Sequence, residues 1–359
     1  MTKVNEPIMI GRHKVKNRIT MAPTVKFDYT DDSGKVTPAL VEHYKTRAQG
    51  GVGLICIEAT AVTPDGRFCH SHMGLWADDQ IEGHKAITAA CHAEDVTVII
   101  QLNHAGSGSF PDMGEAKGPS DITIGDKAVR GMSLEELHDL QQAYIDAAVR
   151  AQKAGYDGVQ LHGCHGYMIN AFMSPYTNLR TDEYGGDEAG RARFGKEIIA
   201  GIRKACGPDF LISIRIAGAE PTAAASIQMA EDYVAAGCDY LQVSFGTSQS
   251  FEPKTDEAFS YTSLRKFGQA FYQHFKGRVP VSLVGGILTP EDAREIIETD
   301  QADTIDLARG MLADGNLANA ILSGADYVKC FDCAGGCQYS PFKPHKCPAA
   351  LKRGKNACD

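Results

Sequence analysis

The sequence predicts an α/β fold, a (β/α)8 TIM barrel with a short cysteine-rich C-terminal extension. Short runs rich in apolar and β-branched residues recur eight times, and segments of helical periodicity lie between them. Eight such strand–helix units within about 320 residues fit a closed barrel. An open dinucleotide-binding sheet fits less well, because no G-x-G-x-x-G motif follows the first strand.

The expected strands are short and apolar, as in parallel sheets that are covered on both faces. They span residues 18–22, 53–59, 97–102, 158–162, 210–216, 240–244, 279–284 and 304–308. The expected helices include residues 38–49, 81–94, 134–154, 189–205, 223–236, 263–275 and 290–299. Gly50, Gly155 and Gly237 follow three of these helices, where we expect left-handed backbone.

The composition excludes several classes of protein. The chain has 359 residues, of which 43% are apolar and 23% charged, as is typical of globular proteins. Its 36 basic and 45 acidic residues give a net charge of −9, without a basic run that could follow a phosphate backbone. The polar N-terminus and the absence of a long apolar run predict neither a signal peptide nor a membrane span. We therefore expect a cytoplasmic protein with a small-molecule substrate, no nucleic-acid or membrane partner, and a chain compatible with homo-oligomers.

One stretch, residues 159–186, gathers the groups most suited to chemistry. It begins as a strand and places His162, His165 and Tyr167 within six residues at the strand's end. Two imidazoles and a phenol can hydrogen-bond a carbonyl oxygen and deliver a proton. The alternative is that the histidines are satisfied polar groups of an ordinary loop and that the Tyr167 hydroxyl caps it.

Special residues also follow the other strands, where a TIM barrel carries its active site. Glycines after strand seven would let backbone N–H groups approach a phosphate, and an arginine after strand eight could bind it. A polar stretch from residue 103 to about 131 is longer than an ordinary loop. The strand-end residues concerned are Pro23, Thr24, Gln101, Arg215, Gly285, Gly286 and Arg309.

The eleven cysteines fall into two groups. Six are scattered through the barrel, and we expect them to be small buried residues: Cys56, Cys69, Cys91, Cys164, Cys206 and Cys238. The others crowd into a tail, residues 326–359, that follows the barrel of residues 1–325. Four have metal-site spacing, namely Cys330, Cys333, Cys337 and Cys347, and Cys358 is expected to be a spare thiol. An iron–sulfur cluster, a structural zinc and unliganded cysteines all remain open.

The motifs together resemble the old yellow enzyme family of flavin oxidoreductases, most closely the barrel of 2,4-dienoyl-CoA and 2-enoate reductases. The resemblance covers nearly the whole chain. It rests on MAPT (21–24), EATAV (58–62), QLNHAG (101–106), QLHGCHGY (160–167), NLRTDEYGG (178–186), SIRIAG (213–218), VGGI (284–287) and LARG (307–310).

The resemblance implies non-covalent FMN at the barrel mouth. Pro23, Thr24 and Ala59 would line its ring system, while Gln101 and Arg215 would contact its pyrimidine edge. The phosphate-binding positions of the family correspond to Gly285, Gly286, Arg309 and Gly310. In the resembling reductases a similar cysteine run, with a longer final spacing, binds a [4Fe–4S] cluster.

The resemblance also implies an NAD(P)H-dependent ene-reductase. His162 and His165 would bind the substrate carbonyl, and Tyr167 would protonate the α-carbon of the alkene after hydride has reached the β-carbon. Alternatives are a dehydrogenase or demethylase of the same superfamily, an electron-transfer component, and a flavin-free barrel aldolase or isomerase with a catalytic lysine.

Two residues of the first strand-end loop depart from the family. Val25 stands where related enzymes often have a threonine or cysteine, which tunes the flavin potential by hydrogen bonding or by sulfur contact. Valine can make neither of these interactions. Lys26 is unexpected so near a flavin, and we predict that it faces solvent.

Overall fold

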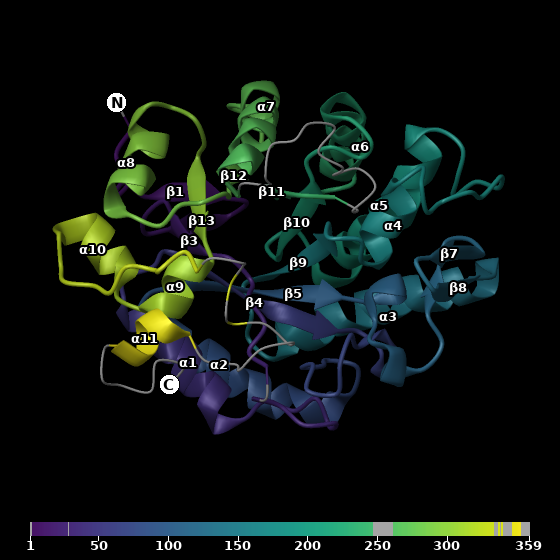
Figure 1. The fold of residues 1–359 in the computed structure, drawn as a ribbon, viewed down its shortest axis with the longest axis horizontal. Helices are drawn as coiled ribbons and strands as arrows, with labels where there is room; N and C mark the ends of the chain where they lie inside the picture. Colours follow the sequence, from purple (N-terminus) through teal and green to yellow (C-terminus); the bar gives the residue numbers. More distant parts are fainter. Residues whose placement is uncertain are drawn as a thin grey trace.

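The computed structural model describes residues 2–27, 29–246, 261–333, 337, 339 and 347–352. Eight parallel strands close into a barrel in the order β3, β4, β5, β9, β10, β11, β12 and β13, with β13 pairing back to β3 (Figure 1). The predicted TIM barrel is confirmed. Its strands are β3 (Ile19–Met21), β4 (Leu54–Ala61), β5 (Thr97–Asn103), β9 (Gly158–Gly163), β10 (Leu211–Ala217), β11 (Tyr240–Ser244), β12 (Val281–Leu283) and β13 (Thr304–Leu307).

All seven predicted helices are present around the barrel. They are α1 (Pro38–Gln49), α2 (Ile81–His92), α3 (Leu134–Lys153), α5 (Glu188–Cys206), α6 (Ala223–Ala235), α7 (Arg265–Phe275) and α8 (Pro290–Glu298). Capping side chains fix where several of them begin. The Thr37 hydroxyl accepts from the Leu40 N–H at the start of α1, and Ser133 and Glu136 form a capping box at the start of α3.

Several elements were not predicted. The long polar stretch after β5 contains a small sheet of β6 (Lys117–Gly118), β7 (Ile122–Ile124) and β8 (Lys127–Gly131). A hairpin of β1 (Ile8–Ile10) and β2 (His13–Val15) precedes the barrel. Short helices are α4 (Met168–Met173), α9 (Arg309–Ala313), α10 (Leu317–Ser323) and α11 (Pro348–Lys352). Single 3-10 turns are Pro64–Gly66, Asp78–Gln80, Gly106–Gly108, Pro111–Met113 and Tyr261–Leu264.

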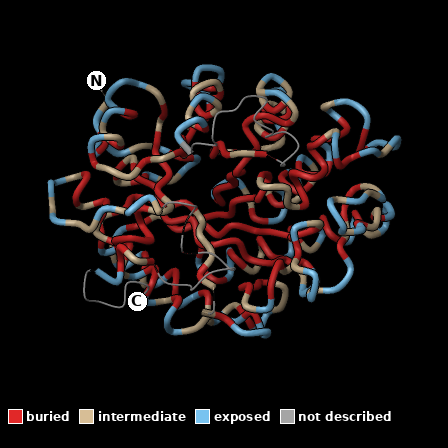
Figure 2. The backbone as a smooth tube through the Cα atoms, in the orientation of Figure 1, coloured by how far each residue is buried: buried red, intermediate tan, exposed pale blue. Residues whose placement is uncertain are grey.

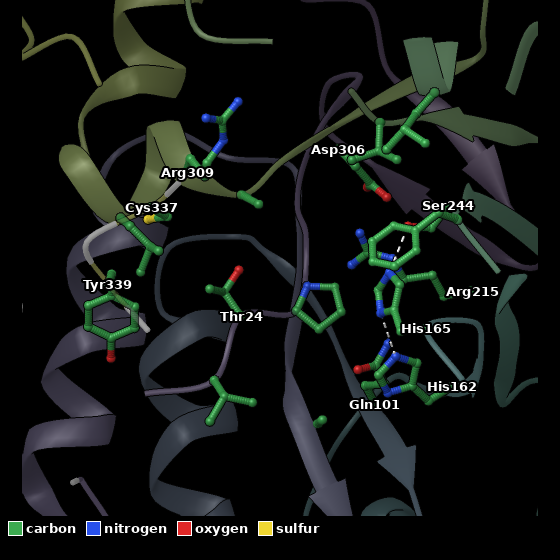
Figure 3. Close-up of a pocket in the computed structure, with 18 of the residues that line it drawn as sticks. Thr24, Gln101, His162, His165, Arg215, Ser244, Asp306, Arg309, Cys337 and Tyr339 are labelled. Atoms are coloured by element: carbon green, nitrogen blue, oxygen red, sulfur yellow. Dashed lines mark hydrogen bonds between the residues drawn. The ribbon is translucent and has the colours of Figure 1, made fainter. Parts of the chain in front are cut away.

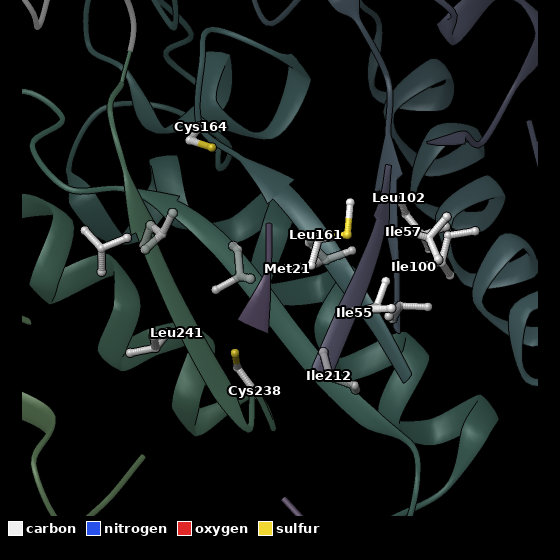
Figure 4. Close-up of a cluster of buried hydrophobic side chains, with 14 of the residues drawn as sticks. Met21, Ile55, Ile57, Ile100, Leu102, Leu161, Cys164, Ile212, Cys238 and Leu241 are labelled. Carbon is white, nitrogen blue, oxygen red and sulfur yellow. The ribbon is translucent and has the colours of Figure 1, made fainter. Parts of the chain in front are cut away.

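The main hydrophobic core lies between the barrel and its helices. Outward side chains such as Ile57, Ile100 and Leu161 belong to it (Figure 4), and the barrel strands are the most deeply buried part of the chain (Figure 2). A second cluster fills one end of the barrel interior, where Ile10 and Val15 of the hairpin pack against strand residues. The six scattered cysteines are buried, as expected.

Inward side chains alternate along each strand, and this alternation positions the site. Gln160 and His162 share one face of β9, and the strand pairing sets His162 beside Arg215 of β10. Arg215 is in turn paired with Gln242 of β11. Some of the polar inward groups hydrogen-bond across strands, as Gln101 Nε2 does to Gln160 Oε1 at 2.7 Å.

One predicted helix end is wrong in detail. Gly50 has a φ of −70°, and the left-handed residue after α1 is Gly51, with a φ of +90°. Gly50 is required for a different reason, because a Cβ there would lie 1.8 Å from the Gly315 carbonyl oxygen. Gly155 and Gly237 are left-handed, as predicted. Among the described residues, no helix has the length and apolar character needed to cross a membrane.

Candidate active site

A cavity of about 490 Å³ opens at the carboxyl ends of the barrel strands (Figure 3). It brings together all but one of the residues predicted to contact a flavin or substrate. Gly310 is the exception: it is buried at the start of α9, where a Cβ would lie 2.5 Å from Leu317. The predicted residues that line the cavity are Pro23, Thr24, Ala59, Gln101, His162, His165, Tyr167, Arg215, Gly285, Gly286 and Arg309.

The two histidines lie against each other on one wall of this cavity. His162 Nε2 is 3.0 Å from His165 Nδ1, and His165 Nε2 is 2.8 Å from Ser244 Oγ. His165 has a φ of +65°, a strained conformation outside glycine, which turns its ring back toward His162. Burial, the positive charge of Arg215 and, for His162, the neighbouring His165 hold both imidazole pKa values well below the usual range. Both rings are therefore neutral.

Tyr167 completes this wall. Its ring lies 4.6 Å from the His162 ring, centroid to centroid, and packs on Gly108, where a Cβ would come within 2.8 Å of it. Burial first, and then Cys164 and Cys69, raise the pKa of the phenol to about 12. Tyr167 thus keeps its proton at neutral pH and can donate it. Its side chain lines the cavity.

A buried charge cluster underlies the same cavity. Asp306 of β13 accepts two hydrogen bonds from Gln242 Nε2, at 2.7 and 2.8 Å, and one from Thr20. Burial raises the Asp306 pKa, and the nearby Arg215 opposes that rise. Arg215 Nε is itself buried and has no hydrogen-bond partner among the described residues. Such an orphaned donor in a cavity fits a ligand with acceptor atoms.

The part of the cavity that follows β12 has backbone suited to an approaching phosphate. Gly285 and Gly286 have φ values of +133° and +60°, which side chains would strain. Arg265 donates to both of their carbonyl oxygens, at 2.7 and 3.2 Å. Arg309 lines the cavity, but its guanidinium is hydrogen-bonded to Asp332 of the tail and points away from the histidine pair (Figure 3).

The prediction that Lys26 faces solvent is wrong. Lys26 is fully buried, with 0% of its surface exposed, and its ammonium lies over the rings of Tyr29 and Tyr339, at 4.4 and 4.8 Å. Its backbone N–H donates to Glu58 Oε2 at 3.0 Å, and Tyr44 donates to the same oxygen. Tyr339 belongs to the tail, so the sequence around Lys26 could not predict this contact.

Burial raises the pKa of Glu58 to about 7. Because the native state then binds a proton that the unfolded chain releases near its ordinary pKa of 4.5, stability should fall as the pH rises from about 5 to 8. Glu58→Gln keeps an acceptor for Tyr44 but cannot ionise. Between pH 5 and 8, the free energy of unfolding should fall in both proteins, but by roughly 1 to 3 kcal/mol less in this variant than in the parent. Urea unfolding at several pH values would measure both slopes. Equal slopes for the two proteins would contradict the assignment.

The four spaced cysteines of the tail face one small cavity beside the large one. Cys330, Cys333, Cys337 and Cys347 all line it, and Cys337 lines the large cavity as well. Helix α11 packs on α9, which begins at Arg309, so the tail lies at the cavity rim (Figure 1). Cys358 lies outside the described residues.

Several lining residues were not predicted. Ser244 and Asp306 could have been found from strand parity, because they lie two residues beyond the inward Gln242 and Thr304. The aromatic side chains carried no such signal, because they come from loops and the tail. They are Phe27, Phe68, Phe110, Phe245 and Tyr339.

Comparison with known proteins agrees with this geometry. The model of the NADH:flavin oxidoreductase / NADH oxidase family matches residues 3–326. The chain belongs to this family, that of the old yellow enzymes. An NADPH dehydrogenase of Bacillus pumilus (strain SAFR-032) is 35% identical over 321 residues, which are 87% of this chain and 92% of that protein.

Solved old yellow enzyme structures superimpose on most of the chain. The homologue from Zymomonas mobilis has a TM-score of 0.76 and 26% identity, covering 92% of this chain and 95% of its own. A 2-naphthoyl-CoA reductase in complex with 2-naphthoyl-CoA has a TM-score of 0.86 and 27% identity over 94% of this chain, which spans about half, 55%, of that protein. The protein is therefore an FMN-dependent NAD(P)H oxidoreductase of the old yellow enzyme type.

Proposed function

We propose that this old yellow enzyme homologue is an ene-reductase acting on alkenes conjugated to a carbonyl group. The observation that carries the proposal is the wall formed by His162, His165 and Tyr167 in the cavity. Neutral imidazoles can donate hydrogen bonds to a carbonyl oxygen and stabilise negative charge on it, whereas an amine substrate of a dehydrogenase or demethylase has no carbonyl oxygen. The reaction also needs a proton donor for the alkene, and the Tyr167 phenol, which stays protonated at neutral pH, can supply that proton.

The residues present fit FMN, and this fit defines what each would do. Pro23, Thr24 and Ala59 would line the ring system, and the orphaned Arg215 Nε would meet an acceptor at its pyrimidine edge. The strand-seven glycines, with Arg309 at the rim, would hold the phosphate. When bound, FMN supplies a hydride, obtained from NAD(P)H, to the β-carbon of the alkene.

The protein's own groups handle the charge and the proton. His162 and His165 stabilise negative charge on the carbonyl oxygen as the hydride arrives, and they do so without changing protonation state. Tyr167 then delivers its proton to the α-carbon. Aromatic side chains at the mouth, such as Phe68 and Phe110, limit the access of water.

The two half-reactions test this function separately. NADPH added without oxygen should bleach the flavin absorption, and 2-cyclohexenone added afterwards should restore it within the same sample. Cyclohexanone, which has the carbonyl but no alkene, is the control and should restore nothing. Reduction by NADPH with no reoxidation by any enone would contradict the proposal and favour an electron-transfer component.

We further infer that the tail cysteines hold an iron–sulfur cluster rather than zinc. A tetrahedral zinc with Zn–S bonds of 2.3 Å requires sulfurs about 3.8 Å apart. Within the part of the chain that the structure describes, His162, Cys164 and His165 form the only group of three potential ligands within 4.8 Å of one another, so no three tail sulfurs meet that limit. A cluster in which each cysteine binds a different iron tolerates wider spacing.

Metal analysis of anaerobically purified protein should therefore show about four irons per chain and no stoichiometric zinc. Cys337→Ser should lose the iron and the broad absorption of the cluster while the flavin bands remain. Cys206→Ser, at a buried cysteine far from the tail in sequence, is the matched control and should keep both. One equivalent of zinc in the parent protein would overturn the cluster.

A further inference from the structure

Ser244 joins the histidine pair to the end of β11. Its Oγ lies 2.8 Å from His165 Nε2, at the end of the hydrogen-bonded chain that runs on to His162 (Figure 3). The backbone N–H of His165 donates to the Phe245 carbonyl at 3.2 Å, and its ring packs on the Phe245 ring with centroids 4.3 Å apart. The end of β11 therefore fixes both the backbone and the ring of His165.

The Nδ1 atom of His162 indicates which groups donate in the series of hydrogen bonds from His162 through His165 to Ser244. His162 Nδ1 is buried and has no hydrogen-bond partner among the described residues. A buried N–H without an acceptor is rarer and more costly than a lone pair without a donor. The single proton of neutral His162 therefore lies on Nε2 and is donated to His165 Nδ1. His165 in turn carries its proton on Nε2 and donates it to Ser244 Oγ.

In this arrangement the N–H of His165 is already donated to Ser244. Only the His162 Nε2–H can therefore be donated to a ligand that enters between the two rings. An oxyanion that enters between the rings can accept from His162 Nε2–H. His165 can add a second donor through Nδ1 only if its single proton lies there, and its Nε2 then needs a donor. A serine hydroxyl can both donate and accept a hydrogen bond. Ser244 can therefore accept from His165 when the proton is on Nε2, and donate to Nε2 when the proton is on Nδ1.

We propose that Ser244 is a positioning residue whose hydroxyl changes from acceptor to donor when an oxyanion binds, so that His165 donates through Nδ1 beside His162 Nε2–H. The change moves one proton between the two nitrogens of a single ring by exchange with water in the cavity, and no proton is gained or lost. As a refinement of substrate binding, this inference rests on the proposed function, but its test does not require turnover.

The test measures binding of a stable oxyanion by calorimetry to the FMN-loaded protein. The probe is 4-nitrophenol at pH 8, where it is a phenolate, and its methyl ether is the neutral control. Ser244→Ala should weaken phenolate binding at least tenfold and change binding of the ether less than twofold. Ser244→Thr, which keeps the hydroxyl, should bind phenolate within threefold of the parent. Ser244→Cys, a weak donor, replaces the alanine variant if that variant does not hold FMN, with weaker phenolate binding expected.

Three results would overturn the proposal: unchanged phenolate binding by the alanine variant, equal weakening of phenolate and ether, or a threonine variant as weak as the alanine one. Equal weakening would mean that Ser244 only shapes the cavity. The proposed function fails separately, if the parent protein reduces no enone. If the parent protein reduces no enone but Ser244→Ala still binds phenolate tenfold more weakly, the proposed reaction is wrong and the proposed role of Ser244 stands.

Discussion

Replacing His162 and His165 together with alanine should slow alkene reduction at least a thousandfold while leaving FMN binding and flavin reduction by NADPH nearly unchanged. In the proposed function, each neutral imidazole donates a hydrogen bond to the carbonyl oxygen that strengthens as negative charge develops there, and one such donor is typically worth 10²–10³-fold. Rapid-mixing kinetics of the two half-reactions would measure both quantities on the same protein.

The matched control for this variant is His138→Ala, because His138 lies on α3 and does not line the cavity. That variant should retain both half-reactions. Loss of FMN from the double variant would contradict the assignment, since it would mean that the histidines hold the cofactor rather than the substrate. Equal slowing of both half-reactions would contradict it as well.

Tyr167→Phe should slow the reoxidation of the flavin by an enone about 10²–10⁴-fold, which is the usual contribution of a positioned general acid. Flavin reduction by NADPH should not change, because that step needs no proton from the phenol. The phenol of Tyr167 has a raised pKa of about 12, so the parent enzyme should keep its proton donor across the neutral range and lose it only in strong alkali.

A second tyrosine provides the comparison for this variant. Tyr176 is exposed and does not line the cavity, so Tyr176→Phe should behave as the parent protein does. If Tyr167→Phe slowed the two half-reactions equally, or slowed neither, another group or water would be the proton donor.

The strands and the site positions could be predicted because they depend on local patterns. Each barrel strand is a short apolar run between glycines and polar residues, and the barrel topology then places the strand ends at one mouth. A barrel also predicts that residues as distant in sequence as Thr24, Arg215 and Gly286 lie in one site. The structure places them around one cavity.

What could not be predicted depends on contacts between distant segments. Lys26 is buried because Tyr339 reaches it from the tail, and the hydrogen bond between His165 and Ser244 joins residues 79 positions apart. The sheet of β6, β7 and β8 has strands of two to five residues in a polar stretch, too short to show a two-residue periodicity.

The fate of labelled hydrogen tests the central claim most directly. NADPH carrying deuterium at the transferred position of its nicotinamide would be oxidised by the enzyme with 2-cyclohexenone under anaerobic conditions, and the product analysed by NMR. We predict deuterium at the β-carbon of cyclohexanone, and deuterium at the α-carbon when unlabelled NADPH is used in heavy water instead. Formation of cyclohexanone with the label from NADPH at the α-carbon, or consumption of NADPH without any cyclohexanone, would contradict the account.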